Sequence, residues 1–363
     1  MLKMEDLKYP ERYELEEVCR NFVKRRFLNE FMQERGIFAV NSSNEEISAI
    51  LSNCVLDSVG IERIRMNAFQ GSNRNSLSGF TITSSQVGFS IKDIYEKARD
   101  DDKILLSKGY SLSVLTKETR DEKVGYKGQI DYEIHRPGRI QFIDKEKGQC
   151  EFFLFEKDNS EWQVEVNGTK AQDGKEVQKL FTKLVGNNLT ILHVLNFENL
   201  KNHQTIEFFD EVIKRGLSKE WNFQDVVGLT FRKGHDEEYE ENEEDESLAS
   251  STTLTGIRQA VLEGGHLRED AFVKQFEEQG CVFSAMTLEY SNTNTPEVIH
   301  IRAEFKGNPK IFEVSVMASY ENEGVEGNRV AYPISPERNL QIRSEFWNNS
   351  KEIYKELISI GKR

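Results

Sequence analysis

The first part of the chain carries apolar residues at helical spacing. Between residues 11 and 35 they recur three or four positions apart, which predicts one helix over this range. Ser43 and Glu46 have the spacing of a capping box, so a second helix is expected to run to about residue 56. Residues 70–79 are rich in Gly, Ser and Asn and indicate a loop. We therefore expect a mainly helical N-terminal domain over residues 1–107.

The middle of the chain changes to a period of two. Apolar and polar residues alternate in short runs about ten residues apart, with turn-forming residues between them, which is typical of an antiparallel meander. We expect a domain over residues 108–232 that combines an antiparallel sheet with helices. Its expected strands include 112–114, 130–132, 140–142, 153–155 and 162–166, and its expected helices are 175–185 and 204–215.

The last part mixes both periods. Apolar spacing predicts a C-terminal α+β domain over residues 254–363, built as an α-β-β-β-α unit. The whole chain is thus expected to have an α+β fold, with a helical N-terminal block, a central antiparallel β-meander and this C-terminal unit. The expected C-terminal elements are helices at 256–263 and 270–279, strands at 282–290, 298–305 and 311–320, and a final helix at 340–360.

One segment accounts for most of the negative charge. The formal net charge is −14, and residues 236–246 hold nine acids and no base. Such a segment cannot repay its ordering entropy, so residues 233–253 are expected to form an acidic mobile linker or loop. It could solubilise the chain, dock on a basic partner or imitate the charge of nucleic acid. A predicted strand at 226–232 is available to the C-terminal sheet, which would make the segment a loop within one domain.

The sequence also bounds the compartment. No apolar run approaches the length of a membrane span, and no apolar stretch of signal-peptide length follows the N-terminus. The four cysteines are far apart and form no CxxC pair, which favours reduced structural thiols. We expect a cytoplasmic protein that is not associated with a membrane.

One strand offers a chemical site. In the run 298–306 the polar residues alternate, so Glu304 and Lys306 share one face. Glu289, on the preceding strand, is expected on the same face. Two carboxylates could hold Mg²⁺, and the lysine could stabilise charge. The Glu304-Phe305-Lys306 run resembles the E-x-K half of the PD-(D/E)xK nuclease pattern, although the Pro-Asp half is missing.

That resemblance implies a metal-dependent nuclease or phosphodiesterase. Glu304 and Lys306 would be catalytic, and Glu289 and Glu304 would be the metal ligands. The competing interpretation is a solvated strand face, where charged residues alternate because water lies beside them.

The densest basic group lies in the first predicted helix. It could contact phosphates of a nucleic acid, or it could be an ordinary solvated helix face supported by an intrahelical pair with Glu16. The group consists of Arg20, Lys24, Arg25 and Arg26.

No complete catalytic set appears in the sequence. Together with the acidic segment, this favours an interaction or regulatory protein. Such a protein would be a non-catalytic subunit of a larger assembly, with a protein partner and the option of nucleic-acid association. The alternative is the metal-dependent hydrolase. No cofactor is expected, apart from Mg²⁺ under that alternative.

Overall fold

The computed structural model of this chain describes residues 9–360 apart from several short segments and one long one. The residues outside the description include the whole acidic run, so the predicted linker over residues 233–253 falls there except for Lys233. The segments left out are 41, 71–74, 85–91, 93–94, 97–103, 105, 107–108, 121–122, 136–139, 159–160, 170, 186–188, 193–194, 234–258, 270–272, 276–279, 308–309, 322–329 and 333.

The chain divides into two compact units, each assembled from separate stretches of sequence. The first unit comprises residues 1–74, 98–115 and 128–150, and the second comprises residues 75–97, 116–127 and 151–363. Strands β2, β3 and β4 contribute residues to both units. The consecutive domains that the sequence suggests stay a prediction.

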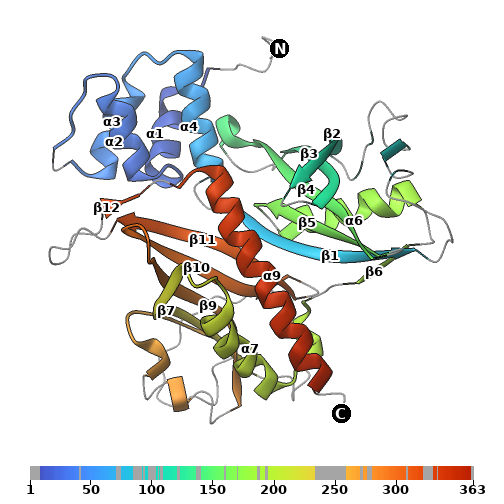
Figure 1. Cartoon of the computed structure of the whole chain (residues 1–363). Coiled ribbons are helices and arrows are strands. Elements are labelled where there is room, and N and C mark those ends of the chain that lie inside the picture. The colour runs from blue at the N-terminus through green and yellow to red at the C-terminus, as the bar shows by residue number, and fades with distance from the viewer. Residues whose placement is uncertain are drawn as a thin grey trace. The chain divides into compact units, whose positions relative to one another are not determined.

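The first unit contains a bundle of helices around its own apolar core (Figure 1). The predicted capping box is confirmed: the Ser43 hydroxyl accepts from the Glu46 amide, and the Glu46 carboxylate accepts from the Ser43 amide at 2.7 Å. Leu28, Phe31 and Ile47 are fully buried in the core. The helices are α1 (Arg12–Asn21), α2 (Arg25–Gln33), α3 (Asn44–Ser52) and α4 (Ser58–Gln70).

The single helix predicted over residues 11–35 is wrong, because the chain forms α1 and α2 with a break between them. The break exposes Phe22 and buries Val23 in the core, and the Asn67 side chain accepts from the Lys24 amide at 3.3 Å. Apolar spacing continues through the break because both helices face the same core. Periodicity alone therefore does not reveal the change of direction.

The strands join one sheet, and the predicted α+β fold is confirmed. Among the described residues the order is β2-β3-β4-β5-β1-β11-β10-β9-β7-β8, with β12 beside β11 and β6 beside β1. Every pair with a defined register is antiparallel. The bounds are β1 (Ser76–Ser84), β2 (Tyr110–Arg120), β3 (Lys123–His135), β4 (Lys145–Asp158), β5 (Glu161–Gly168), β6 (Leu189–Leu192), β7 (Trp221–Lys233), β8 (Gln259–Glu263), β9 (Cys281–Asn292), β10 (Glu297–Lys306), β11 (Ile311–Glu321) and β12 (Val330–Ala331).

Strand β1 corrects the loop predicted at residues 70–79. It lies between β5 and β11 and is covered on both faces, so its side chains do not alternate between apolar and polar. A Cβ atom at Gly79 would lie 2.8 Å from the ring of Trp347. The small residue that suggested a loop is thus required where an aromatic ring rests on the strand.

Two further predicted elements are also wrong. Residues 259–263 form β8 and not a helix: Ala260 and Leu262 pack against the core while Val261 is exposed, so the period is two. The predicted strand at 140–142 is a 3₁₀ turn over Gln141–Ile143. Its apolar side chains all enter the core of the first unit, which a strand would not allow. Of the helix expected at 270–279, residues 273–275 are helical.

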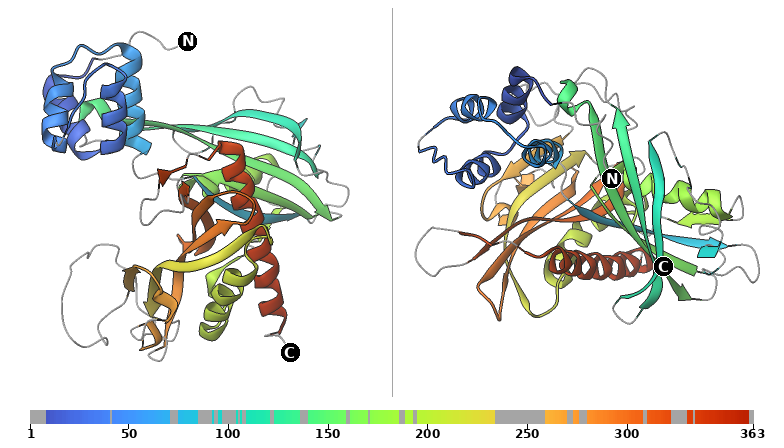
Figure 2. Two further views of the ribbon diagram at one scale, coloured as in Figure 1. Left: turned by 60° about the vertical axis from the view of Figure 1, so that its left-hand side comes forward. Right: turned by 90° about the horizontal axis from the view of Figure 1, so that it is seen from above.

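Helices cover both faces of the sheet in the second unit. Leu77 belongs to the core shared with α7 (Asn202–Arg215) and α9 (Pro336–Ile360). Phe80 instead contacts Phe181 of α6 (Ala171–Val185), with ring centroids 6.3 Å apart. Residues three apart on a strand face opposite sides, so α6 lies on the other face. The long helix α9 runs over β1 and β11 (Figures 1 and 2).

Polar contacts hold α9 against β5, and we call them the β5–α9 seam. The Arg343 guanidinium donates to the Asn167 side chain at 2.8 Å and to the Asn339 side chain at 2.7 Å. The Lys351 ammonium donates to Gln163 at 2.5 Å. Burial lowers the pKa of Arg343 to about 10 and, together with the Lys355 charge, that of Lys351 to about 8. The seam therefore places two cations inside the protein with neutral amide acceptors.

Candidate functional site

Glu304 and Lys306 lie on the polar face of β10, as their alternation predicts. The Glu304 carboxylate accepts from the Arg302 Nε at 3.1 Å and lies 3.9 Å from the Lys306 ammonium. Arg302 also donates to the Thr230 hydroxyl on β7 at 3.4 Å. Two cations from its own strand therefore surround Glu304.

Glu289 shares this face but is not a neighbour of Glu304. Glu289 lies opposite His300, and Glu304 lies opposite Ala285. Four residues along β9 separate these positions, which is about 13 Å at about 3.3 Å per residue. The Glu289 carboxylate is held instead by the His300 ring nitrogen at 2.7 Å. In this register the two predicted metal ligands do not share an ion.

The register brings a different carboxylate to Glu304. Glu313 of β11 lies directly opposite it, where side chains on one face are about 5 Å apart. Burial raises the pKa of Glu313 to about 7. The Lys306 charge lowers that pKa, and the Glu304 charge raises it further. The alternation of the strand at 311–320 was the signal that could have found this residue, once the order of strands was known.

This arrangement can retain a proton on the buried Glu313 carboxyl group. Within the part of the chain that the structure describes, no group of three or more His, Cys, Asp and Glu side chains is placed to hold a metal ion. The face thus offers one carboxylate surrounded by cations and one carboxyl group that titrates near neutral pH. Phosphodiester hydrolysis by Glu304 and Lys306 stays a prediction.

The basic group lies around the junction of α1 and α2 in the first unit, and all four side chains are exposed. Arg26 pairs with Glu30 at 2.9 Å, and Arg25 donates to the Ser42 carbonyl at 2.7 Å. Arg20 and Lys24 have no carboxylate partner among the described residues. These two cations therefore remain available to an external anion.

The same helical unit exposes large apolar side chains. Nine of the fifteen exposed large apolar residues in the described part of the chain fall between residues 9 and 66. Val55 is 98% exposed, and Val59 follows it by four residues at the start of α4. The Tyr9 hydroxyl accepts from the Leu56 amide at 3.4 Å, which places the Tyr9 hydroxyl next to the backbone between Val55 and Val59. We call Tyr9, Val55 and Val59 the apolar helical surface.

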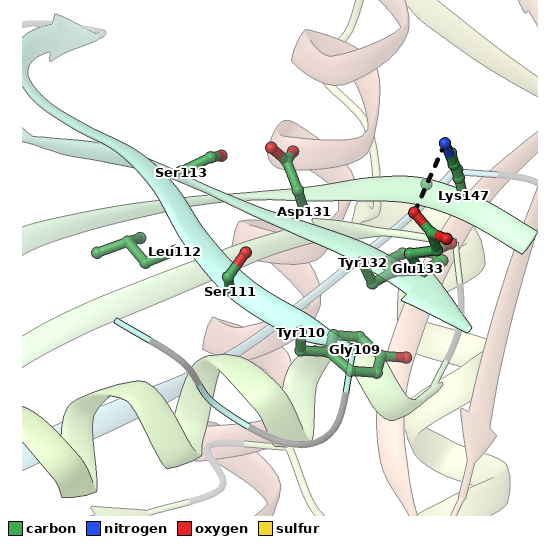
Figure 3. Close-up of a pocket in the computed structure, with 10 residues that line it drawn as sticks. Gly109, Tyr110, Ser111, Leu112, Ser113, Asp131, Tyr132, Glu133 and Lys147 are labelled. Carbon is green, nitrogen blue, oxygen red and sulfur yellow. Dashed lines mark ion pairs between the residues drawn. The ribbon is translucent and has the colours of Figure 1, made fainter. Parts of the chain in front are cut away.

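A cavity of about 700 Å³ lies in the first unit, at the end of β2, β3 and β4 (Figure 3). Strand alternation puts polar side chains on one face there and buries Leu112 and Tyr132 on the other. Glu133 pairs with Lys147 at 3.5 Å. The lining residues are Gly109, Tyr110, Ser111, Leu112, Ser113, Asp131, Tyr132, Glu133, Lys147 and Gly148.

All four cysteines are free thiols, as the sequence predicts. Burial raises the pKa of Cys19 to about 12, which makes this thiol a poor nucleophile. Among the helices in the described segments, none has the length and apolar composition needed to cross a membrane.

Comparison with known proteins gives little guidance. No protein-family model matches the chain, and no curated protein matches it. Among solved structures, it can be compared with the crystal structure of DynU16, a putative protein in the dynemicin biosynthetic locus. That comparison has 9% sequence identity, covers 78% of this chain and 98% of that chain, and has a TM-score of 0.18. At this score the likeness supports no inference about function.

Proposed function

We propose that this chain is an interaction protein, a subunit of a larger assembly that binds a protein partner through its helical unit. The observation that carries the proposal is the apolar helical surface, where Tyr9, Val55 and Val59 are each exposed and the Tyr9 hydroxyl accepts from the amide of Leu56, which follows Val55. Single exposed apolar residues are ordinary, but a group of them marks an interaction site. The reduced cysteines agree with a cytoplasmic assembly.

A partner that covers the apolar helical surface would gain binding free energy from the buried side chains. Burying one such side chain stabilises a complex by about 1.5–3 kcal/mol. Three such exposed side chains can therefore contribute to the apolar centre of an interface. The helices beneath them are held by a separate, fully buried core, so the surface is not needed for folding. A partner would gain a rigid, preformed surface.

Site-specific photo-cross-linking tests the proposal. A photoreactive residue is placed at Val55 and, as a control, at the exposed Glu207 of α7, and the full chain is irradiated in its native cells. We expect one discrete adduct from position 55 and none from position 207. Adducts of equal yield from both positions, or none from either, contradict the proposal.

A paired variant sharpens the same experiment. With the photoreactive residue at Tyr13, which is also exposed at the start of α1, Val55→Asp should abolish the discrete adduct. Glu207→Gln should leave it unchanged. An adduct that survives Val55→Asp would place the interface elsewhere.

Association with nucleic acid is a second candidate, and the free cations favour it. Arg20 and Lys24 lie four residues apart, with Arg25 and Arg26 beside them, and all are exposed. Binding of double-stranded RNA and DNA, measured by fluorescence anisotropy, should weaken with added salt. The double change Arg20→Glu and Lys24→Glu should weaken it further. If neither added salt nor this double variant weakens binding, the basic group is not the nucleic-acid-binding site.

The metal-dependent hydrolase remains the alternative for the polar face of β10. Incubation with DNA and RNA in Mg²⁺, Mn²⁺ or EDTA, beside Glu304→Ala and Glu289→Ala, separates the cases. Cleavage that needs metal and is lost in Glu304→Ala would establish the hydrolase. If Glu289→Ala retains that cleavage, Glu289 is not part of the hydrolytic site, as its distance from Glu304 along the strands indicates.

A further inference from the structure

The cavity at the end of β2, β3 and β4 is bounded by closely packed strands. The Glu133 amide donates to the Gly109 carbonyl at 2.8 Å. A Cβ atom at Gly109 would lie 2.2 Å from the Glu133 carbonyl oxygen, and one at Gly148 would lie 2.3 Å from the Tyr132 hydroxyl. Glycines at these two positions therefore let the strands and the tyrosine pack closely. A cavity built this way is formed before any ligand arrives, which lowers the cost of binding.

Polar groups converge on one side of the cavity. Figure 3 shows the side chains of Ser111, Ser113, Asp131 and Glu133 projecting from the same side of β2 and β3. The Ser113 hydroxyl donates to the Gln129 carbonyl at 3.0 Å. The Ser111 hydroxyl has no protein partner among the described residues, so it can both donate to and accept from a ligand.

The side chains that line the cavity carry a formal net charge of −1, from Asp131, Glu133 and Lys147. Glu133 is compensated by Lys147. Asp131 instead accepts only from the neutral amide of Gln129, at 2.7 Å, and within the described ranges no cation lies at ion-pair distance from it. An ionised carboxylate accepts several hydrogen bonds, so Asp131 keeps acceptor capacity that faces the cavity.

We propose that this cavity binds a small organic cation that carries hydroxyl groups, of the amino-sugar or amino-alcohol class. The ammonium group of the ligand lies against Asp131, and its hydroxyl groups exchange hydrogen bonds with Ser111 and Ser113. Charge selects the cation, because an anionic ligand would meet an uncompensated carboxylate. The hydroxyls select a polar ligand over a purely apolar amine. This site is separate from the apolar helical surface and does not depend on the proposed function.

Titration with glucosamine and glucose tests the charge requirement. Heteronuclear NMR follows the full chain at about pH 6, where an amine of this type is protonated. We expect glucosamine to shift the signals of Ser111 and Asp131 saturably. Glucose, which has the same ring without the charge, should bind at least about tenfold more weakly, because a hydrogen bond to a charged group is lost.

Variants assign the effect to the cavity. Asp131→Asn keeps the shape and removes the charge, so it should weaken glucosamine binding at least about tenfold. Ser111→Ala should weaken it several-fold, whereas Glu207→Gln removes an equal charge from α7 and should change nothing. Circular dichroism confirms that each variant is folded. The proposal is overturned if glucosamine does not bind, if both sugars bind equally, or if Asp131→Asn binds as the parent chain does.

Discussion

The β5–α9 seam and the apolar helical surface depart from the usual partition of side chains in opposite directions. In the seam, Arg343 and Lys351 lie inside the protein and donate to amide groups of the same chain. At the surface, Val55 and Val59 face solvent. Contacts within the chain therefore account for the buried cations of the seam, whereas the exposed valines have no such account within the described residues and are assigned to the proposed partner.

Removal of the buried Arg343 guanidinium is expected to have the largest effect on stability. Arg343 is 1% exposed, so Arg343→Ala leaves a void and strips two asparagine side chains of their donor. We expect a loss of about 3–5 kcal/mol in the free energy of unfolding, measured by urea denaturation. Arg20→Ala, on the exposed end of α1, should change it by less than about 0.5 kcal/mol. A loss below about 1 kcal/mol for Arg343→Ala would show that water replaces the guanidinium.

A second prediction concerns the buried carboxyl group of Glu313. Its pKa in the folded chain is about 7, against an ordinary value of 4.5, so between these values the folded chain binds more protons than the unfolded chain. The stability contributed by this proton is fully present below about pH 4.5 and is lost as the pH rises through about 7.

Glu313→Gln should remove this pH dependence and raise stability at pH 8 by up to about 3 kcal/mol. The measurement is the free energy of unfolding between about pH 5 and pH 8, with Glu207→Gln as the control. Parallel pH profiles for the parent chain and Glu313→Gln would mean that Glu313 is solvated in solution.

A matched pair of glycine variants tests how closely α9 packs on the sheet. Gly79→Ala should destabilise the chain by about 1–3 kcal/mol, because its Cβ would lie 2.8 Å from both the Trp347 ring and the Val164 carbonyl oxygen. Gly174→Ala, within α6, meets only the Ser78 hydroxyl at 4.0 Å and should stabilise by about 0.5–1 kcal/mol. Thermal unfolding of both variants checks the pair, and equal shifts would contradict the close contact.

The smallest effect on stability belongs to the apolar helical surface. Val55→Ser with Val59→Ser should change the free energy of unfolding by less than about 0.5 kcal/mol, because both side chains are exposed. A loss above about 1 kcal/mol would show that these valines stabilise the fold, which would remove the reason to assign them to a partner.

The sequence predicted elements whose signal is local. The capping box is recognised from the spacing of Ser43 and Glu46. The helix α9 is recognised from the helical spacing of its apolar residues. The strand β10 alternates clearly between buried and partly exposed residues because one of its faces is polar. These features do not depend on distant neighbours, so local periodicity and capping residues predict them.

The missed features depend on partners far away in sequence. The sequence of strand β1 is typical of a loop, and the reason for Gly79 is clear only once the Trp347 ring is seen to pack against it. Glu313 is unremarkable until the register sets it opposite Glu304. The cavity differs, because its three strands follow one another in the chain, but local alternation does not show that their ends enclose a cavity. The residues of the candidate site were therefore only partly predictable.

The position of β1 also has a consequence for synthesis on the ribosome. Ser76 pairs with Gly168 on one side and Ser315 on the other. Thr81–Ser84 pair with β6, but the first residues of that edge pair with a segment made roughly 240 residues later. At roughly 5–20 residues per second, that delay is on the order of 10–50 s. During this interval the first residues of β1 lack their final neighbour on one edge of the nascent chain, and that part of the edge would be open to chaperones and to pairing with other nascent chains.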